Sequence, residues 1–188
     1  MVVAVISLVI LAVAVLYAVQ IYNNLVRLKH GIDKAWANID VALKQRHEEL
    51  PKLVEVCKQY MHYEQETLDR VVRARGAVFE ASAEGDPKRL GAAEGALRAG
   101  LGSLFALAEG YPDLKANDSF RHLSTRISGL EETIADRREL YNESVNRNNV
   151  RIEQFPDLFV ARLFAFGPRE LLEFASERQD VDLRALFG

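Results

Sequence analysis

The chain has 188 residues, of which 49% are hydrophobic and 27% are charged, and its formal net charge is -3 at pH 7. Lysine and arginine are interleaved with aspartate and glutamate along the polar segments, so the sequence lacks the one-sided basic surface of a nucleic-acid-binding protein. Nucleic acid is therefore not an expected partner. The single cysteine, Cys57, cannot form an intramolecular disulfide and belongs to no zinc-binding spacing, which favours a reducing compartment.

The first predicted element is an apolar run from Val2 to Val19, interrupted by Ser7 and Tyr17 and followed by a border of polar and aromatic residues. A helix rises about 1.5 Å per residue, so the run covers the roughly 30 Å hydrocarbon core of a bilayer. A cleaved signal peptide is the rival interpretation, but no lysine or arginine precedes the run, which is longer than a usual signal core. We predict a transmembrane anchor over residues 1–22.

Cations follow this span and none precedes it, since Arg27, Lys29 and Lys34 come directly after the apolar run. Positive charge is retained on the cytoplasmic side of a membrane. The sequence therefore predicts an N-terminus outside and a cytoplasmic C-terminal domain.

Apolar residues then recur at spacings of three and four, the heptad pattern of packed helices. They are Ile32, Trp36, Ile39, Leu43, Leu50, Leu53, Cys57, Tyr60, Val71, Ala74 and Val78. The pattern keeps its phase across Pro51, which favours one kinked helix. The alternative is that one helix ends at Leu50 and Pro51 opens the next.

Two further helices are predicted downstream. Asp86 and Pro87 are typical of an N-cap and a first helical residue, and this helix should stop near Gly110. It contains several glycines, so it either packs closely against a neighbour or is the least stable part of the fold. After a short turn through Asn117 and Asp118, a long helix should run to just before Pro156. With no period-two segment, the fold class is all-α: an N-terminal transmembrane helix continuing into an elongated antiparallel bundle of three to four helices.

The C-terminal segment, residues 157–188, opens with an aromatic apolar run that is too short to span a bilayer. It can fold back over the core, contact another subunit, or insert its aromatic face into the membrane interface. The candidate interaction residues are Leu158, Phe159, Leu163, Phe164 and Phe166.

Polar residues interrupt the apolar stripes at Arg46 and Glu64 in the first helix and at Arg137 and Asn148 in the long helix. A buried unpaired charge is strongly unfavourable, so these side chains reach solvent at the edge, pair across helices, or line a subunit interface. Pairing would fix the helix register.

No chemical motif stands out. The histidines, His30, His47, His62 and His122, occur in no Glu-x-x-His arrangement, and glycine-rich phosphate loops and a Gly-x-Ser-x-Gly turn are absent from the sequence. We expect no catalytic residues, no cofactor and no metal.

Several segments together resemble one family. They are residues 22–26 (YNNLV), 33–41 (DKAWANIDV), 50–54 (LPKLV), 108–117 (AEGYPDLKAN), Tyr141-Asn142, Phe155-Pro156 and 161–164 (ARLF). In order and spacing they are similar to the LemA family over almost the whole chain. The resemblance implies a bacterial inner-membrane protein with a cytoplasmic bundle of long antiparallel helices. It implies no established activity, although one relative is associated with magnetosome membrane biogenesis.

The sequence thus predicts an anchor over 1–22, a cytoplasmic bundle over 23–156 and an aromatic segment over 157–188. The function expected is a non-enzymatic scaffold or membrane-organising protein that self-associates at the cytoplasmic face, with the lipid bilayer and further copies as partners. The alternative is an accessory or docking subunit that binds a membrane protein partner in an enzyme complex, and a hydrolase is a distant third.

Overall fold

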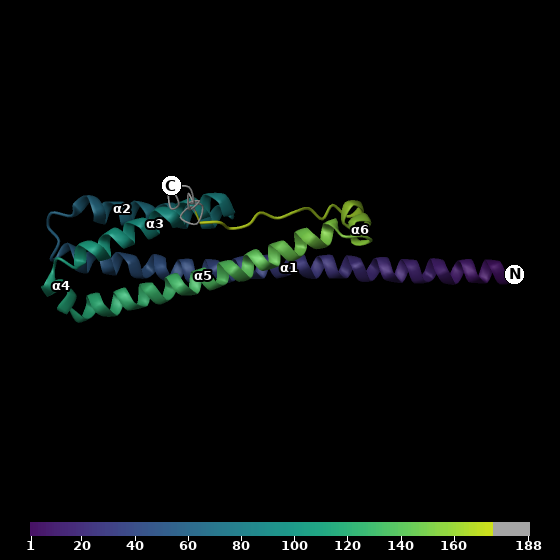
Figure 1. Cartoon of the computed structure of the whole chain (residues 1–188), viewed down its shortest axis with the longest axis horizontal. Helices are drawn as coiled ribbons and strands as arrows, with labels where there is room; N and C mark the ends of the chain where they lie inside the picture. Colours follow the sequence, from purple (N-terminus) through teal and green to yellow (C-terminus); the bar gives the residue numbers. More distant parts are fainter. Residues whose placement is uncertain (175–188) are drawn as a thin grey trace, which may run out of the picture. The chain divides into compact units, whose positions relative to one another are not determined.

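The computed structural model describes residues 1–174, which form helices joined by short connections (Figure 1). The helices are α1 (Val2–Lys58), α2 (Gln65–Glu84), α3 (Pro87–Ala108), α4 (Pro112–Ala116), α5 (Asp118–Glu153) and α6 (Asp157–Leu163). No strand occurs in this part of the chain, and the all-α prediction is confirmed. The rest of the predicted C-terminal segment, residues 175–188, lies outside the described residues.

Helix boundaries follow the local capping chemistry. Asp86 is the N-cap of α3, and its side-chain Oδ1 accepts hydrogen bonds from the backbone amides of Lys88 at 2.9 Å and Arg89 at 3.1 Å. These bonds satisfy amides that have no partner within the first helical turn. The start predicted for α3 and its stop near Gly110 are confirmed, and α5 already begins at Asp118, which was expected in the turn before it.

Helix α1 continues through Pro51, as expected for a single helix at this point, but it ends at Lys58. The prediction that the same helix carries Glu64 and extends to Val78 is wrong, because residues 59–64 form a turn before α2. Met61 is fully buried in this turn and donates its backbone N–H to the Cys57 carbonyl at 2.8 Å. The apolar side chains on both sides of the turn still face the core. The heptad pattern therefore continues across residues 59–64 and does not reveal that the helix ends there.

The described residues divide into two compact units. The span unit contains residues 1–37 and 139–171, and the bundle unit contains residues 38–138 and 172–174. In the bundle unit, α2 and α3 lie side by side (Figure 1). Its core is built from apolar side chains of α1, α2, α3 and α5, among them Leu53, Leu68, Leu97 and Ile127.

Close packing explains part of the glycine content of α3. A Cβ atom at Gly91 would overlap the backbone carbonyl oxygen of Glu173, and one at Gly100 would lie 3.3 Å from the Val71 Cγ2 atom. At Gly102 nothing lies within 4 Å of the added atom. The close-packing interpretation is therefore confirmed at Gly91 and Gly100 and does not hold at Gly102.

Candidate membrane-interface site

The N-terminal part of α1 exposes its apolar side chains on every side. Large apolar side chains from Val2 to Val19 are between 49% and 76% exposed. Within residues 1–174, α1 is the one helix long and apolar enough to cross a membrane. A soluble surface rarely carries so large a continuous apolar patch, because hydrating it is unfavourable. The burial pattern therefore agrees with the span predicted from composition.

Burial begins immediately after this stretch, where α6 packs on α1. Ile21 and Leu25 of α1 form a small core with Ile152, Val160 and Ala161, and Leu28 and Phe166 close its edges. The α6 helix is fixed electrostatically as well. Its first residue, Asp157, is 2% exposed and accepts a hydrogen bond from the Arg151 Nε atom at 2.6 Å. A buried carboxylate needs such a partner, so this pair links the last turn of α5 to the first residue of α6.

Helix α6 and the residues on either side of it carry exposed aromatic and apolar side chains, which we call the aromatic cap. Phe155 is 74% exposed, Phe159 61%, Leu163 77% and Phe164 55%. The Phe155 and Phe159 rings meet edge to face with centroids 5.0 Å apart. The Phe164 ring meets Tyr22 of α1 in the same way at 4.7 Å, so the cap joins α1 where the apolar run ends.

The predicted tail residues therefore serve two purposes. Phe159, Leu163 and Phe164 belong to the exposed cap. Leu158 is partly buried, and Phe166 packs at the edge of the α1–α6 core with its ring 5.7 Å from the Tyr22 ring. One face of this segment thus folds back onto α1, and the opposite face is exposed.

An extended strap, residues 164–171, then returns along α5. The Tyr141 hydroxyl donates to the Glu170 carbonyl at 3.0 Å. Asn149 pairs with the Arg169 backbone through two bonds of 2.9 Å, and Asn148 Nδ2 donates to the Gly167 carbonyl at 3.3 Å. Asn148 is 3% exposed, so the structure places this predicted polar residue in the core as a partner of the strap.

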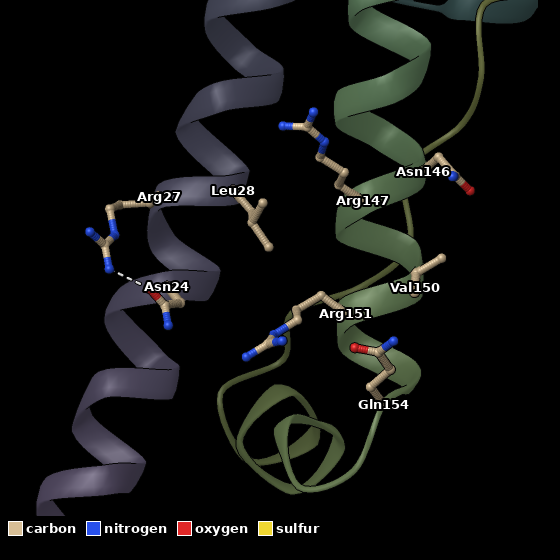
Figure 2. Close-up of a pocket in the computed structure, with 8 residues that line it drawn as sticks. All are labelled: Asn24, Arg27, Leu28, Asn146, Arg147, Val150, Arg151 and Gln154. Atoms are coloured by element: carbon tan, nitrogen blue, oxygen red, sulfur yellow. Dashed lines mark hydrogen bonds between the residues drawn. The ribbon is translucent and has the colours of Figure 1, made fainter.

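An open groove of about 650 Å³ lies between α1 and α5 just beyond the span. Figure 2 shows Arg147 and Arg151 extending from α5 toward α1, whereas Arg27 extends on the far side of α1 in this view and bonds to Asn24. Its other lining residues are Leu28, Asn146, Val150 and Gln154. The groove thus combines cationic and amide side chains with an apolar lining.

The bundle unit contains a buried ionic cluster around Arg46, which is 1% exposed. Arg46 binds both carboxylate oxygens of Glu94, with one of the two bonds at 3.1 Å, and also binds Glu131. Arg98 lies 3.3 Å from Glu131 and stacks over the Phe174 ring. Burial raises the pKa of the Glu94 carboxyl, and the charge of Arg46 opposes that rise.

Arg46 therefore pairs across helices, one of the arrangements considered for it. Its main partner, Glu94, was not singled out from the sequence, although its spacing from Leu90, Leu97 and Leu101 places it in the apolar stripe of α3. Glu94 is fully buried. Charged residues in phase with a leucine stripe would have identified it.

The two other polar positions lie outside the buried core. Arg137 is partly exposed and donates to the backbone carbonyl of Asn38. Glu64 is partly exposed at the N-cap of α2 and accepts a hydrogen bond from the Tyr111 hydroxyl. The assignment of Glu64 to the core stripe is wrong because the turn at 59–64 carries it to the surface.

Chemical groups suited to catalysis are not gathered at these places. Within residues 1–174, no group of three His, Cys, Asp or Glu side chains could hold a metal ion. Cys57 is fully buried, and burial raises the pKa of its thiol to about 11. A protonated buried thiol is a poor nucleophile.

The fold and this site define a membrane-associated helical protein whose candidate span is followed by a helical domain. The model of the LemA family matches residues 35–184. The chain belongs to the LemA family.

Known relatives agree with this assignment. Protein LemA of Metamycoplasma hominis is 29% identical over 181 residues, which cover 94% of this chain and 81% of that protein. Magnetosome protein MamQ 2 of Paramagnetospirillum magneticum is 33% identical over 89 residues, or 47% of this chain. Magnetosome protein MamQ of Magnetospirillum gryphiswaldense is 34% identical over 82 residues. The matched regions span 33% and 30% of the lengths of these two magnetosome proteins.

Proposed function

We propose that this chain is a non-enzymatic scaffold that organises membrane by contacting the bilayer at two places, the span and the aromatic cap. The observation that carries the proposal is the position of the cap, which packs on α1 at Tyr22, directly after the apolar run. Aromatic side chains are favoured at the boundary between hydrocarbon and headgroups.

A second contact with the bilayer changes what the anchor does. A lone helix can rotate about its axis and tilt, whereas α6 is held to α1 by the core around Ile21 and Leu25. With the cap in the interface, rotation of α1 would pull aromatic side chains into water. The span unit thereby acquires a preferred orientation in the membrane plane.

Oriented copies can associate side by side, and self-association at the cytoplasmic face is the second part of the proposal. An apolar side chain outside the cap, Leu140 of α5, is 59% exposed and available for such contacts. The cytoplasmic placement rests on Arg27, Lys29 and Lys34 after the span. The shared family with magnetosome proteins supports a role at membranes.

The position of the cap is tested with a single tryptophan. Phe159→Trp is combined with Trp36→Phe, and the full chain is reconstituted in vesicles containing brominated lipids. Shallow bromines should quench the new tryptophan strongly. The native chain is the control, because Trp36 lies fourteen residues beyond Tyr22, or about 21 Å along the helix. Equal, weak quenching of both tryptophans would refute interfacial insertion.

Self-association is tested by light scattering of the detergent-solubilised chain. A mass of several protomers supports a scaffold, whereas a monomer at all concentrations would reject it and favour the docking subunit of a membrane enzyme complex. An engineered C-terminal cysteine tests the topology. Labelling of that cysteine by a membrane-impermeant reagent in intact cells would contradict the cytoplasmic placement.

A further inference from the structure

We propose that the groove between α1 and α5 binds the headgroup of an anionic phospholipid from the leaflet facing the helical domain. This inference rests on the proposed membrane placement and assigns a ligand class to one site beside the span. It is argued from the depth of the groove, its charge and its apolar lining near the span.

The depth of the groove matches a headgroup layer. The headgroup region adds about 5–8 Å to each side of the hydrocarbon core, which corresponds to about three to five helical residues. With a span ending near Tyr22, this layer includes Asn24 and Arg27, which line the groove. Arg151 of α5 lines the same groove (Figure 2).

The charge of the groove suits a phosphodiester. The Arg151 Nε atom donates to Asp157 at 2.6 Å, and its guanidinium extends toward α1. Arg147 is 67% exposed and pairs with Glu143 at the surface, an arrangement weak enough for an anion to compete. Arg27 donates to the neutral Asn24 amide. Guanidinium groups bind phosphate oxygens through two parallel hydrogen bonds, which favours arginine at such sites.

Neutral groups complete the site. The side-chain amides of Asn24, Asn146 and Gln154 offer donors and acceptors for glycerol or headgroup hydroxyls. Leu28 and Val150 provide apolar surface, and the exposed span above the groove provides the surface along which acyl chains lie. A free phosphate would use the arginines alone. The combination of cations with an apolar lining, a few residues beyond the exposed apolar span, favours a lipid over a free anion.

The test compares spin-labelled phosphatidylglycerol with spin-labelled phosphatidylcholine around the full chain in phosphatidylcholine nanodiscs. Electron paramagnetic resonance measures the motionally restricted fraction of each, and hence their relative association constant. We expect the anionic lipid to be preferred at least threefold. Each juxtamembrane cation contributes about a fivefold effect before competition, so Arg27→Gln combined with Arg147→Gln should reduce the ratio to about one.

Three further variants separate a built site from general surface charge. Glu143→Gln removes the competing carboxylate and should raise the preference. Arg162→Gln, an exposed cation on α6 outside the groove, should leave it unchanged. Arg151→Lys keeps the charge beside Asp157 but loses the planar fork, so it should lower the preference while α6 stays docked. Equal effects of Arg162→Gln and Arg147→Gln would overturn the proposal.

Inorganic phosphate is titrated as a separate arm, with binding followed by line broadening of its phosphorus resonance. Saturable phosphate binding together with no preference for the anionic lipid in phosphate-free buffer would overturn a lipid site in favour of a free anion. The result is independent of the cap experiment. Quenching of the Phe159→Trp variant without lipid selectivity rejects the groove alone, whereas selectivity without quenching rejects the cap.

Discussion

Removing the cation at the centre of the buried cluster should unfold the bundle unit selectively. In Arg46→Met, the fully buried Glu94 loses the partner of both its oxygens, while Glu131 keeps Arg98 at 3.3 Å. Breaking a buried pair by removing one partner costs about 3–5 kcal/mol, because an uncompensated charge stays behind. Arg46→Met should therefore lower the free energy of opening of α3 by about 3–5 kcal/mol.

Removing both partners should restore much of that loss. In the double variant Arg46→Met with Glu94→Leu, apolar side chains of similar length replace the pair, and such replacements are often neutral or stabilising. The sign of the pH dependence provides a second check. Without Arg46, the raised pKa of Glu94 rises further, so the folded state binds a proton more tightly than the unfolded state. The single variant should therefore lose stability as pH rises through that pKa.

Amide hydrogen exchange of α3 peptides in the detergent-solubilised full chain measures these effects without contributions from the span. Arg70→Met, at an exposed pair with Glu66, is the matched control and should change the opening free energy by no more than about 0.5 kcal/mol. If Arg46→Met and the double variant were equally destabilised, packing volume would explain the effect better than the unpaired charge of Glu94.

Three further predictions concern single positions. Gly91→Ala should destabilise the bundle unit by about 1–3 kcal/mol in urea denaturation, because the added methyl group overlaps the backbone carbonyl of Glu173. Gly102→Ala has open space around the added methyl group and should stabilise α3 by up to about 1 kcal/mol. If Gly102→Ala were the more destabilising of the two, the packing argument would be contradicted. Cys57, buried and with its pKa raised to about 11, should resist maleimide until the chain is denatured, and rapid native labelling would show that its surroundings open. Burial and the charge of Arg75 lower the pKa of His47, so the unfolded chain binds a proton more readily than the folded chain. Thermal stability should therefore fall as pH drops below about 6.5. Arg75→Gln should weaken this pH dependence, and an unchanged pH profile would exclude the His47–Arg75 pair as its cause.

The helix boundaries that depend on local chemistry could be predicted from the sequence. Asp86 followed by Pro87 specifies a helix start through its side-chain and backbone constraints alone. The turn before α2 could not be predicted this way. It contains neither glycine nor proline, and it is held by contacts from a distant part of the chain, such as the 3.2 Å hydrogen bond from the Asn117 amide to the Tyr60 hydroxyl.

The membrane-interface site could be predicted only in part for the same reason. The sequence shows its aromatic composition, and the exposed and buried faces of α6 follow helical spacing, with Phe159 exposed and Val160 buried. The contact of α6 with Ile21 and Leu25 joins residues more than a hundred positions apart, which no local pattern encodes. Likewise, Arg46 was noticed as a charge in a stripe, but its partner depends on how α3 packs.

The composition of the span unit has a consequence for biosynthesis. Its two segments, residues 1–37 and 139–171, are made at different times, since the intervening residues must be translated first. While the ribosome completes the bundle unit, the anchor can already be in the membrane with Ile21 and Leu25 uncovered. At about 5–20 residues per second, that interval lasts several seconds or longer. A nascent chain stopped before Asp157 would be inserted in the membrane without α6. Its exposed Ile21 and Leu25 could then bind a chaperone or the α6 helix of a neighbouring copy.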